Sequence, residues 1–103
     1  MTETILSPSG RLDSHSAPGF EQEVLAAVAG GATRMLIDFS NVQYISSAGL
    51  RIVLIAAKKM KAGGGKLALC ALSDSIAEVF KISGFSSILD IHPDQASALA
   101  ALR

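Results

Sequence analysis

The sequence has few aromatic side chains and a single cysteine. Its 103 residues include four phenylalanines, one tyrosine and no tryptophan, too few to build an aromatic platform on which nucleic-acid bases could stack. Cys70 has no second cysteine to pair with, which excludes an internal disulfide and a thiolate metal cluster. Since His15 and His92 stand alone in polar segments, we predict no metal site and no cofactor.

A surplus of charge is also missing. Nine basic residues balance nine acidic ones, which argues against nucleic acid or an anionic membrane as the main partner, because both attract a basic surplus. The longest apolar run, residues 52–57, is far shorter than the ~20 residues of a membrane span. The N-terminus shows no basic region followed by a long apolar run, as a signal peptide would. We therefore predict a soluble cytoplasmic protein with no direct membrane contact.

Hydrophobic residues are abundant and arranged in short alternating blocks. Half of the residues are hydrophobic and 17% are charged, which suits one packed domain spanning residues 1–103. Apolar spacing predicts four helices, over residues 20–29, 48–62, 74–83 and from 93 onward. Short apolar runs predict strands over 35–39, 66–71 and 88–91, with one brief strand within 4–12. Such alternation predicts an α/β fold with a mainly parallel sheet of about four strands and 35–39 at its centre.

Two adjacent serines stand at the junction between strand 35–39 and helix 48–62. We expect residues 40–46 to form a loop that leads to Ser46 and Ser47. One interpretation is that a serine hydroxyl caps the helix, which would stabilise it by ~1 kcal/mol. The other is that one serine is phosphorylated, because a phosphate there would lie near free backbone N–H groups and the positive end of the helix dipole. The residues alone leave both interpretations open.

The helix that follows the serines is apolar on nearly all sides. One stripe at helical spacing consists of Leu50, Val53, Leu54 and Ala57. Ile52 and Ile55 lie off that stripe, so they either form a partner-binding face or pack beneath neighbouring helices. Arg51 lies in the first turn, where the helix dipole does not favour a cation. It is therefore a candidate partner contact, and the alternative is a side chain that is simply solvated.

Catalytic motifs are not recognisable. Ser47-Ala48-Gly49 is not the Gly-x-Ser-x-Gly turn of a serine hydrolase. The glycine run 63–65 follows a helix and precedes a strand, the reverse of a phosphate-binding loop. Asp13 and Asp38 do not form a catalytic pair by their spacing. We predict that the protein is not an enzyme.

Several segments resemble one known family. The stretch Asp38-Phe39-Ser40, followed by Tyr44-Ile45-Ser46-Ser47-Ala48-Gly49-Leu50, resembles the signature of the STAS domains, the sulfate-transporter and anti-sigma-factor antagonist domains. Gly10-Arg11-Leu12-Asp13 is similar to that family's Gly-x-Leu-Asp element. Residues 63–67 and 79–85 resemble later landmarks of the family. The resemblance covers nearly the whole chain, in the right order.

The resemblance implies the function of a stand-alone bacterial anti-sigma factor antagonist. In such a system the unphosphorylated antagonist binds an anti-sigma factor that is a serine kinase. The kinase then phosphorylates the antagonist, and a PP2C-type phosphatase removes the phosphate. The motif position of the phosphorylated serine falls on Ser47. Many family members have Asp immediately before that serine, whereas this chain has Ser46, a second hydroxyl. Ser46 is therefore the second choice for the phosphorylated residue. Asp13 maps to the family's acidic position close to the serine.

The residues around the serines and the resemblance to STAS domains together predict a partner-binding surface. An alternative function uses the same surface. The predicted surface consists of Asp13, Ser46, Ser47, Gly49, Leu50, Arg51, Ile52 and Ile55. The alternative is an accessory subunit that docks the same helix face on a membrane transporter or lipid-transport complex, without phosphorylation. The family usually has a full strand pair before Gly-x-Leu-Asp, but nine residues precede Gly10 here. We therefore expect a shortened N-terminal strand pair and an exposed sheet edge that could support a homodimer.

Overall fold

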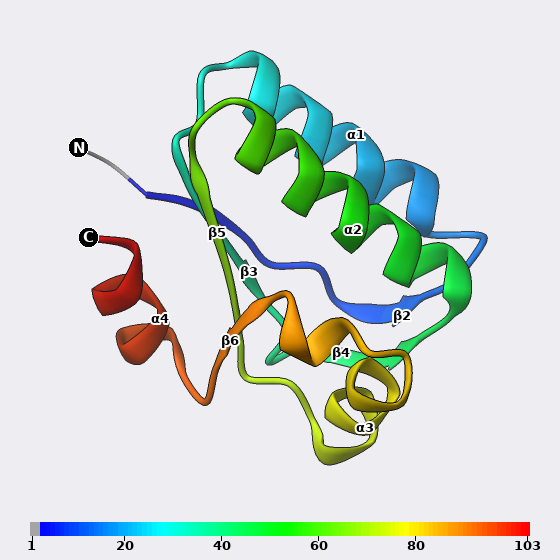
Figure 1. The fold of residues 1–103 in the computed structure, drawn as a ribbon. Coiled ribbons are helices and arrows are strands. Elements are labelled where there is room, and N and C mark those ends of the chain that lie inside the picture. The colour runs from blue at the N-terminus through cyan, green and yellow to red at the C-terminus, as the bar shows by residue number, and fades with distance from the viewer. Residues whose placement is uncertain (1–2) are drawn as a thin grey trace.

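The computed structural model describes residues 3–103 and has a parallel sheet at its centre (Figure 1). The strand order is β1-β3-β5-β6, with bounds Thr4–Leu6, Arg34–Asp38, Lys66–Cys70 and Asp90–His92. Every neighbouring pair in this sheet is parallel. Because β3 pairs with both β1 and β5, the strand predicted to be central is central. The predicted α/β class with a mainly parallel sheet of about four strands is confirmed.

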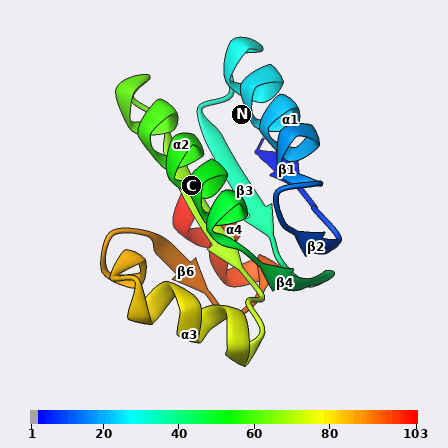
Figure 2. The same cartoon turned by 90° about the vertical axis from the view of Figure 1, so that its right-hand side faces the viewer.

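Helices pack on both faces of this sheet, as its apolar strands require (Figures 1 and 2). Their bounds are Ala17–Ala29 for α1, Ser47–Ala62 for α2, Asp74–Ile82 for α3 and Gln95–Leu102 for α4. The side chains of β3 alternate between two hydrophobic clusters. Met35 and Ile37 join the cluster that includes α1, α2 and α3, whereas Leu36 packs with residues of α4. No helix among residues 3–103 combines the length and apolarity needed to cross a membrane.

A second, two-stranded sheet lies beside the first and carries the predicted site. It pairs β2, Gly10–Leu12, in parallel with β4, Val42–Ile45. The prediction that residues 40–46 form a loop is therefore wrong over β4. Val42 and Ile45 point into the core, with 4% and 5% of their surface exposed, while the backbone between them pairs with a segment about thirty residues earlier in the chain.

The two edge strands of the four-stranded sheet, β1 and β6, can be compared with the predicted strands. The first strand, β1, is present and brief, at the edge of the four-stranded sheet, and Ile5 within it is exposed. A homodimer through this edge stays a prediction. The last strand begins at Asp90 rather than at residue 88, because a short 3-10 helix, Phe85–Ser87, occupies the preceding segment. Ile88 consequently lies outside the strand and is exposed.

Candidate functional site

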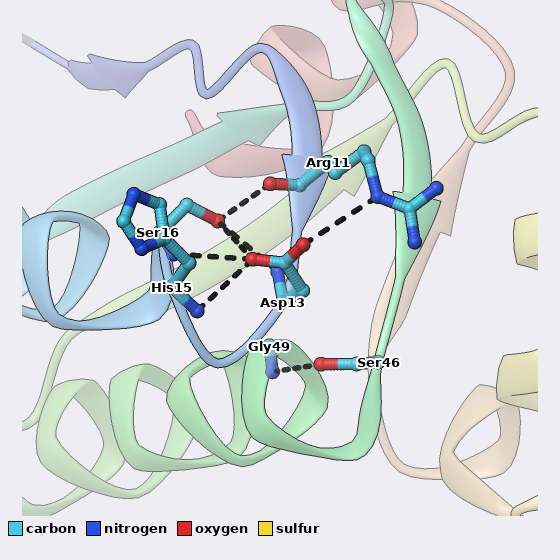
Figure 3. Close-up of polar contacts among 6 residues, drawn as sticks. All are labelled: Arg11, Asp13, His15, Ser16, Ser46 and Gly49. Atoms are coloured by element: carbon cyan, nitrogen blue, oxygen red, sulfur yellow. Dashed lines mark hydrogen bonds and ion pairs between the residues drawn. The ribbon is translucent and has the colours of Figure 1, made fainter.

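The two serines at the start of α2 have different environments. Ser46 precedes the helix with extended backbone, and its Oγ accepts a hydrogen bond from the Gly49 N–H with 3.4 Å between oxygen and nitrogen (Figure 3). Ser47 is the first helical residue and is exposed. Its side chain makes no hydrogen bond to any residue between 3 and 103. Ser46 thus provides the cap that the sequence suggested, and Ser47 presents a free hydroxyl to solvent.

Gly49 allows the first turn of α2 to lie directly against the end of β2. A Cβ at this position would be 2.6 Å from the carbonyl oxygen of Leu12 and 2.9 Å from Cγ1 of Ile45. The same end of β2 is joined to the helix start by a hydrogen bond, 2.8 Å long, from the Ser46 N–H to the Leu12 carbonyl. Only a residue without a Cβ at position 49 therefore allows the start of α2, with Ser47, to lie this close to β2.

Asp13 holds the loop that follows β2. Its carboxylate accepts hydrogen bonds from the backbone N–H groups of His15 and Ser16, at 3.0 and 3.2 Å, and from Arg11 Nε at 3.5 Å (Figure 3). The bond from Ser16 is the main cause that lowers the pKa of the Asp13 carboxyl, and His15 and Arg11 act in the same direction. The predicted acidic site residue therefore has a defined local role, which is to order the loop next to α2.

We expect Asp13→Asn to lower the free energy of unfolding at pH 7, and we expect this deficit to shrink in acid. Because folding lowers the carboxyl pKa below its ordinary value of 3.8, the unfolded chain binds the proton more readily. The stabilisation by the charged carboxylate is thus complete above that value and is lost as the pH falls through the folded-state pKa. Urea unfolding of both proteins at pH 7 and pH 3 measures this, and equal deficits at the two pH values would contradict it.

Arg11 and Tyr44 flank the site on the solvent side, and sequence reasoning missed both. They are register partners on β2 and β4, and the guanidinium carbon of Arg11 lies 4.2 Å from the centre of the Tyr44 ring. Both side chains are exposed. Their proximity depends on β4, which was interpreted as loop. The strand preference of Val42, Tyr44 and Ile45 was the available signal.

Burial corrects part of the predicted partner-binding surface. Leu50 and Ile52 are only 9% and 5% exposed and belong to the core cluster. Ile55 is half-buried and packs against the same cluster. Of the two interpretations of this helix, packing beneath its neighbours is therefore the right one for Ile52. The exposed candidates that remain on α2 are Ser47 and Arg51.

Two other possible sites of chemistry are a metal-binding cluster and the Cys70 thiol. No group of three or more His, Cys, Asp or Glu side chains between residues 3 and 103 is arranged to hold a metal ion. Cys70 is fully buried on β5. Burial, and secondarily the neighbouring charge of Asp38, raises the pKa of its thiol to about 11. The thiol is therefore protonated at neutral pH and serves as a small core side chain.

Comparisons with known proteins decide the family of this chain. The family model described as the STAS domain matches residues 2–98. The chain belongs to the STAS domain family. BtrV of Bordetella bronchiseptica, described as an anti-sigma factor antagonist, is 42% identical over 94 residues, which cover 91% of this chain and 81% of BtrV.

Solved structures agree with this assignment. An anti-sigma factor antagonist from Mycobacterium paratuberculosis superposes with a TM-score of 0.90 at 28% identity, over 98% of this chain and 86% of the other. The Bacillus cell fate determinant SpoIIAA, solved in its phosphorylated form, has a TM-score of 0.75 at 22% identity, over 98% and 91% of the two chains. At this identity, the similarity to SpoIIAA shows a shared fold. The named relatives of this STAS domain are anti-sigma factor antagonists, as the sequence motifs implied.

In this STAS domain α1 and α2 run side by side (Figures 1 and 2). A shallow hollow lies between α1 and the first turns of α2. Its volume is about 200 Å³, and it is lined by Ser14, Ala17, Pro18, Glu21, Ala48, Arg51 and Ile52. The loop ordered by Asp13 thus forms one wall, through Ser14, and the first turns of α2 form another. Arg51 lies on the rim between the two helices.

Proposed function

We propose that this STAS domain is an anti-sigma factor antagonist that binds a serine-kinase anti-sigma factor and is switched off by phosphorylation of Ser47. The observation that carries the proposal is the exposed, uncommitted hydroxyl of Ser47 beside Ser46, whose hydroxyl caps the helix. The antagonist role is supported by the 42% identity to BtrV over most of both chains. The proposed switch is also supported by a protein of the same fold, the Bacillus cell fate determinant SpoIIAA, which has been solved in a phosphorylated form.

The chain acts as a substrate in this reaction. The kinase transfers the γ-phosphoryl group of ATP to Ser47 Oγ, so that an O–P bond forms, the bond to ADP breaks, and the hydroxyl proton passes to a base of the kinase. A PP2C-type phosphatase reverses the change by hydrolysis, in which water supplies the oxygen of the released phosphate. Since this domain contributes only the hydroxyl, the proposal assigns it no catalytic residue.

The position of Ser47 explains how a phosphate could block binding without unfolding the domain. The group would lie at the N-terminus of α2, where the helix dipole favours negative charge. It would add close to two negative charges at neutral pH. If the partner covers this surface, those charges must lose water against a surface that fits a neutral hydroxyl, which is unfavourable. Ser47, Arg51 and the neighbouring Arg11–Tyr44 pair are the exposed groups that we propose as partner contacts.

We expect the cognate kinase and ATP to modify wild-type protein and Ser46→Ala, but not Ser47→Ala. Ser46→Ala removes the neighbouring hydroxyl and the helix cap, so it serves as the matched control, with a stability loss of about 1 kcal/mol or less. Peptide mass spectrometry locates the phosphate. Modification of Ser46 in the wild type, or no modification of either serine by a kinase that is active on a control substrate, would contradict the proposal.

A further inference from the structure

Arg51 is a cation near the N-terminus of α2 that forms no ion pair with any residue between 3 and 103. It is exposed and is the fifth residue of α2, in the half of the helix where the dipole does not stabilise a cation. Among residues 3–103, Arg11 forms an ion pair with Asp13, and His92 Nε2 lies 2.8 Å from Asp90 Oδ1. No carboxylate in this part of the chain forms an ion pair with Arg51. A native ion pair therefore does not account for the arginine at this position.

The geometry of the helix directs Arg51 toward Ser47. The two residues are separated by one turn on the same face of α2, the spacing at which helical side chains interact. Long side chains on a helix lean toward its N-terminus, so the guanidinium covers the turn that precedes its own Cα. Ala48, which lies in that turn, lines the same hollow as Arg51. Glu21 of α1 also lines the hollow and forms no ion pair with Arg51.

We propose that Arg51 is the internal partner of a phosphate on Ser47, and that this contact withdraws Arg51 from the binding surface. This inference rests on the proposed function, because it requires phosphorylated Ser47. In the unmodified domain Arg51 is free to bind an acidic group of the anti-sigma factor. In the phosphorylated domain its guanidinium donates hydrogen bonds to the phosphate oxygens. One modification thereby adds an anion to the surface and removes a cation from it.

The test places phosphoserine at position 47 during translation, using an expanded genetic code, so that no kinase is needed. We expect phosphorus NMR to show a lower second pKa for this phosphate in the otherwise wild-type domain than in Arg51→Gln, because the guanidinium stabilises the dianion. At low ionic strength the phosphate should raise the melting temperature by about 3 °C more in wild type than in Arg51→Gln. Salt at 1 M should remove most of this difference.

Two variants on the same helix make the result specific. Lys58→Gln removes an exposed cation three turns away from Ser47 and should titrate like wild type, whereas Arg51→Lys should recover part of the effect. Identical phosphate titrations in wild type and Arg51→Gln would overturn the inference, as would an equal change in Lys58→Gln. Because the phosphate is introduced without the kinase, a kinase that fails to modify Ser47 overturns the proposed function and leaves this measurement unaffected.

Discussion

Ser47→Asp is expected to weaken binding to the serine-kinase anti-sigma factor by about a hundredfold or more, while Ser47→Ala stays within about threefold of wild-type affinity. A hundredfold loss corresponds to ~3 kcal/mol of binding free energy. An aspartate at this position places a negative charge on the exposed first residue of α2, within the surface that the partner is proposed to cover. Burying this charge against a partner surface that fits a neutral hydroxyl accounts for a loss of this size. Ser47→Ala removes only a hydroxyl that has no hydrogen-bond partner among residues 3–103.

Isothermal titration calorimetry with the purified kinase measures these affinities. The fold should tolerate Ser47→Asp, because a negative charge at a helix N-terminus is favourable, and circular dichroism verifies this. Ala96→Asp is the control, since it adds the same charge to an exposed site in the first turn of α4. This helix packs on the sheet face opposite to α2 (Figure 2). Affinity of Ser47→Asp within about threefold of wild type, or an equal loss in Ala96→Asp, would contradict the predicted switch.

The second large effect is expected from Gly49→Ala, which should lower the free energy of unfolding by about 2–3 kcal/mol and the melting temperature by roughly 10 °C. The added methyl group would lie 2.6 Å from the Leu12 carbonyl oxygen and 3.0 Å from the Leu12 Cβ. The backbone oxygen cannot turn away as the end of a flexible side chain can. The start of α2 must therefore move away from β2, which also strains the bond between Ser46 and Leu12.

A matched glycine separates this close contact from the general effect of replacing glycine in a helix. Gly19 is the third residue of α1, as Gly49 is the third residue of α2. A Cβ at Gly19 would meet no atom within 4 Å, so Gly19→Ala should be neutral or stabilising by up to ~1 kcal/mol. Chemical denaturation of both variants gives the comparison. Similar free energies of unfolding for Gly19→Ala and Gly49→Ala would show that the packing against Leu12 is not the cause.

Local patterns were sufficient to predict most elements of the fold. The apolar run Met35–Phe39 predicted the central strand, and the spacing of apolar residues predicted α2 within about a residue at each end. Both signals lie in neighbouring residues, because strand and helix periodicity are local properties. The strand β4 was missed because its pattern, buried at both ends and exposed between them, acquires meaning only when β2 pairs with it.

The sequence by itself determined that two serines precede an apolar helix, and its motifs placed the site at Ser47, with Asp13 nearby. Only the tertiary structure decided which hydroxyl is committed to the helix cap and which is free, and that Ile52 belongs to the core. It also showed why residue 49 is glycine, through a carbonyl oxygen on another strand. The reason is that capping preference and periodicity are encoded within a few consecutive residues. Burial and close approach instead depend on segments brought together from distant parts of the chain.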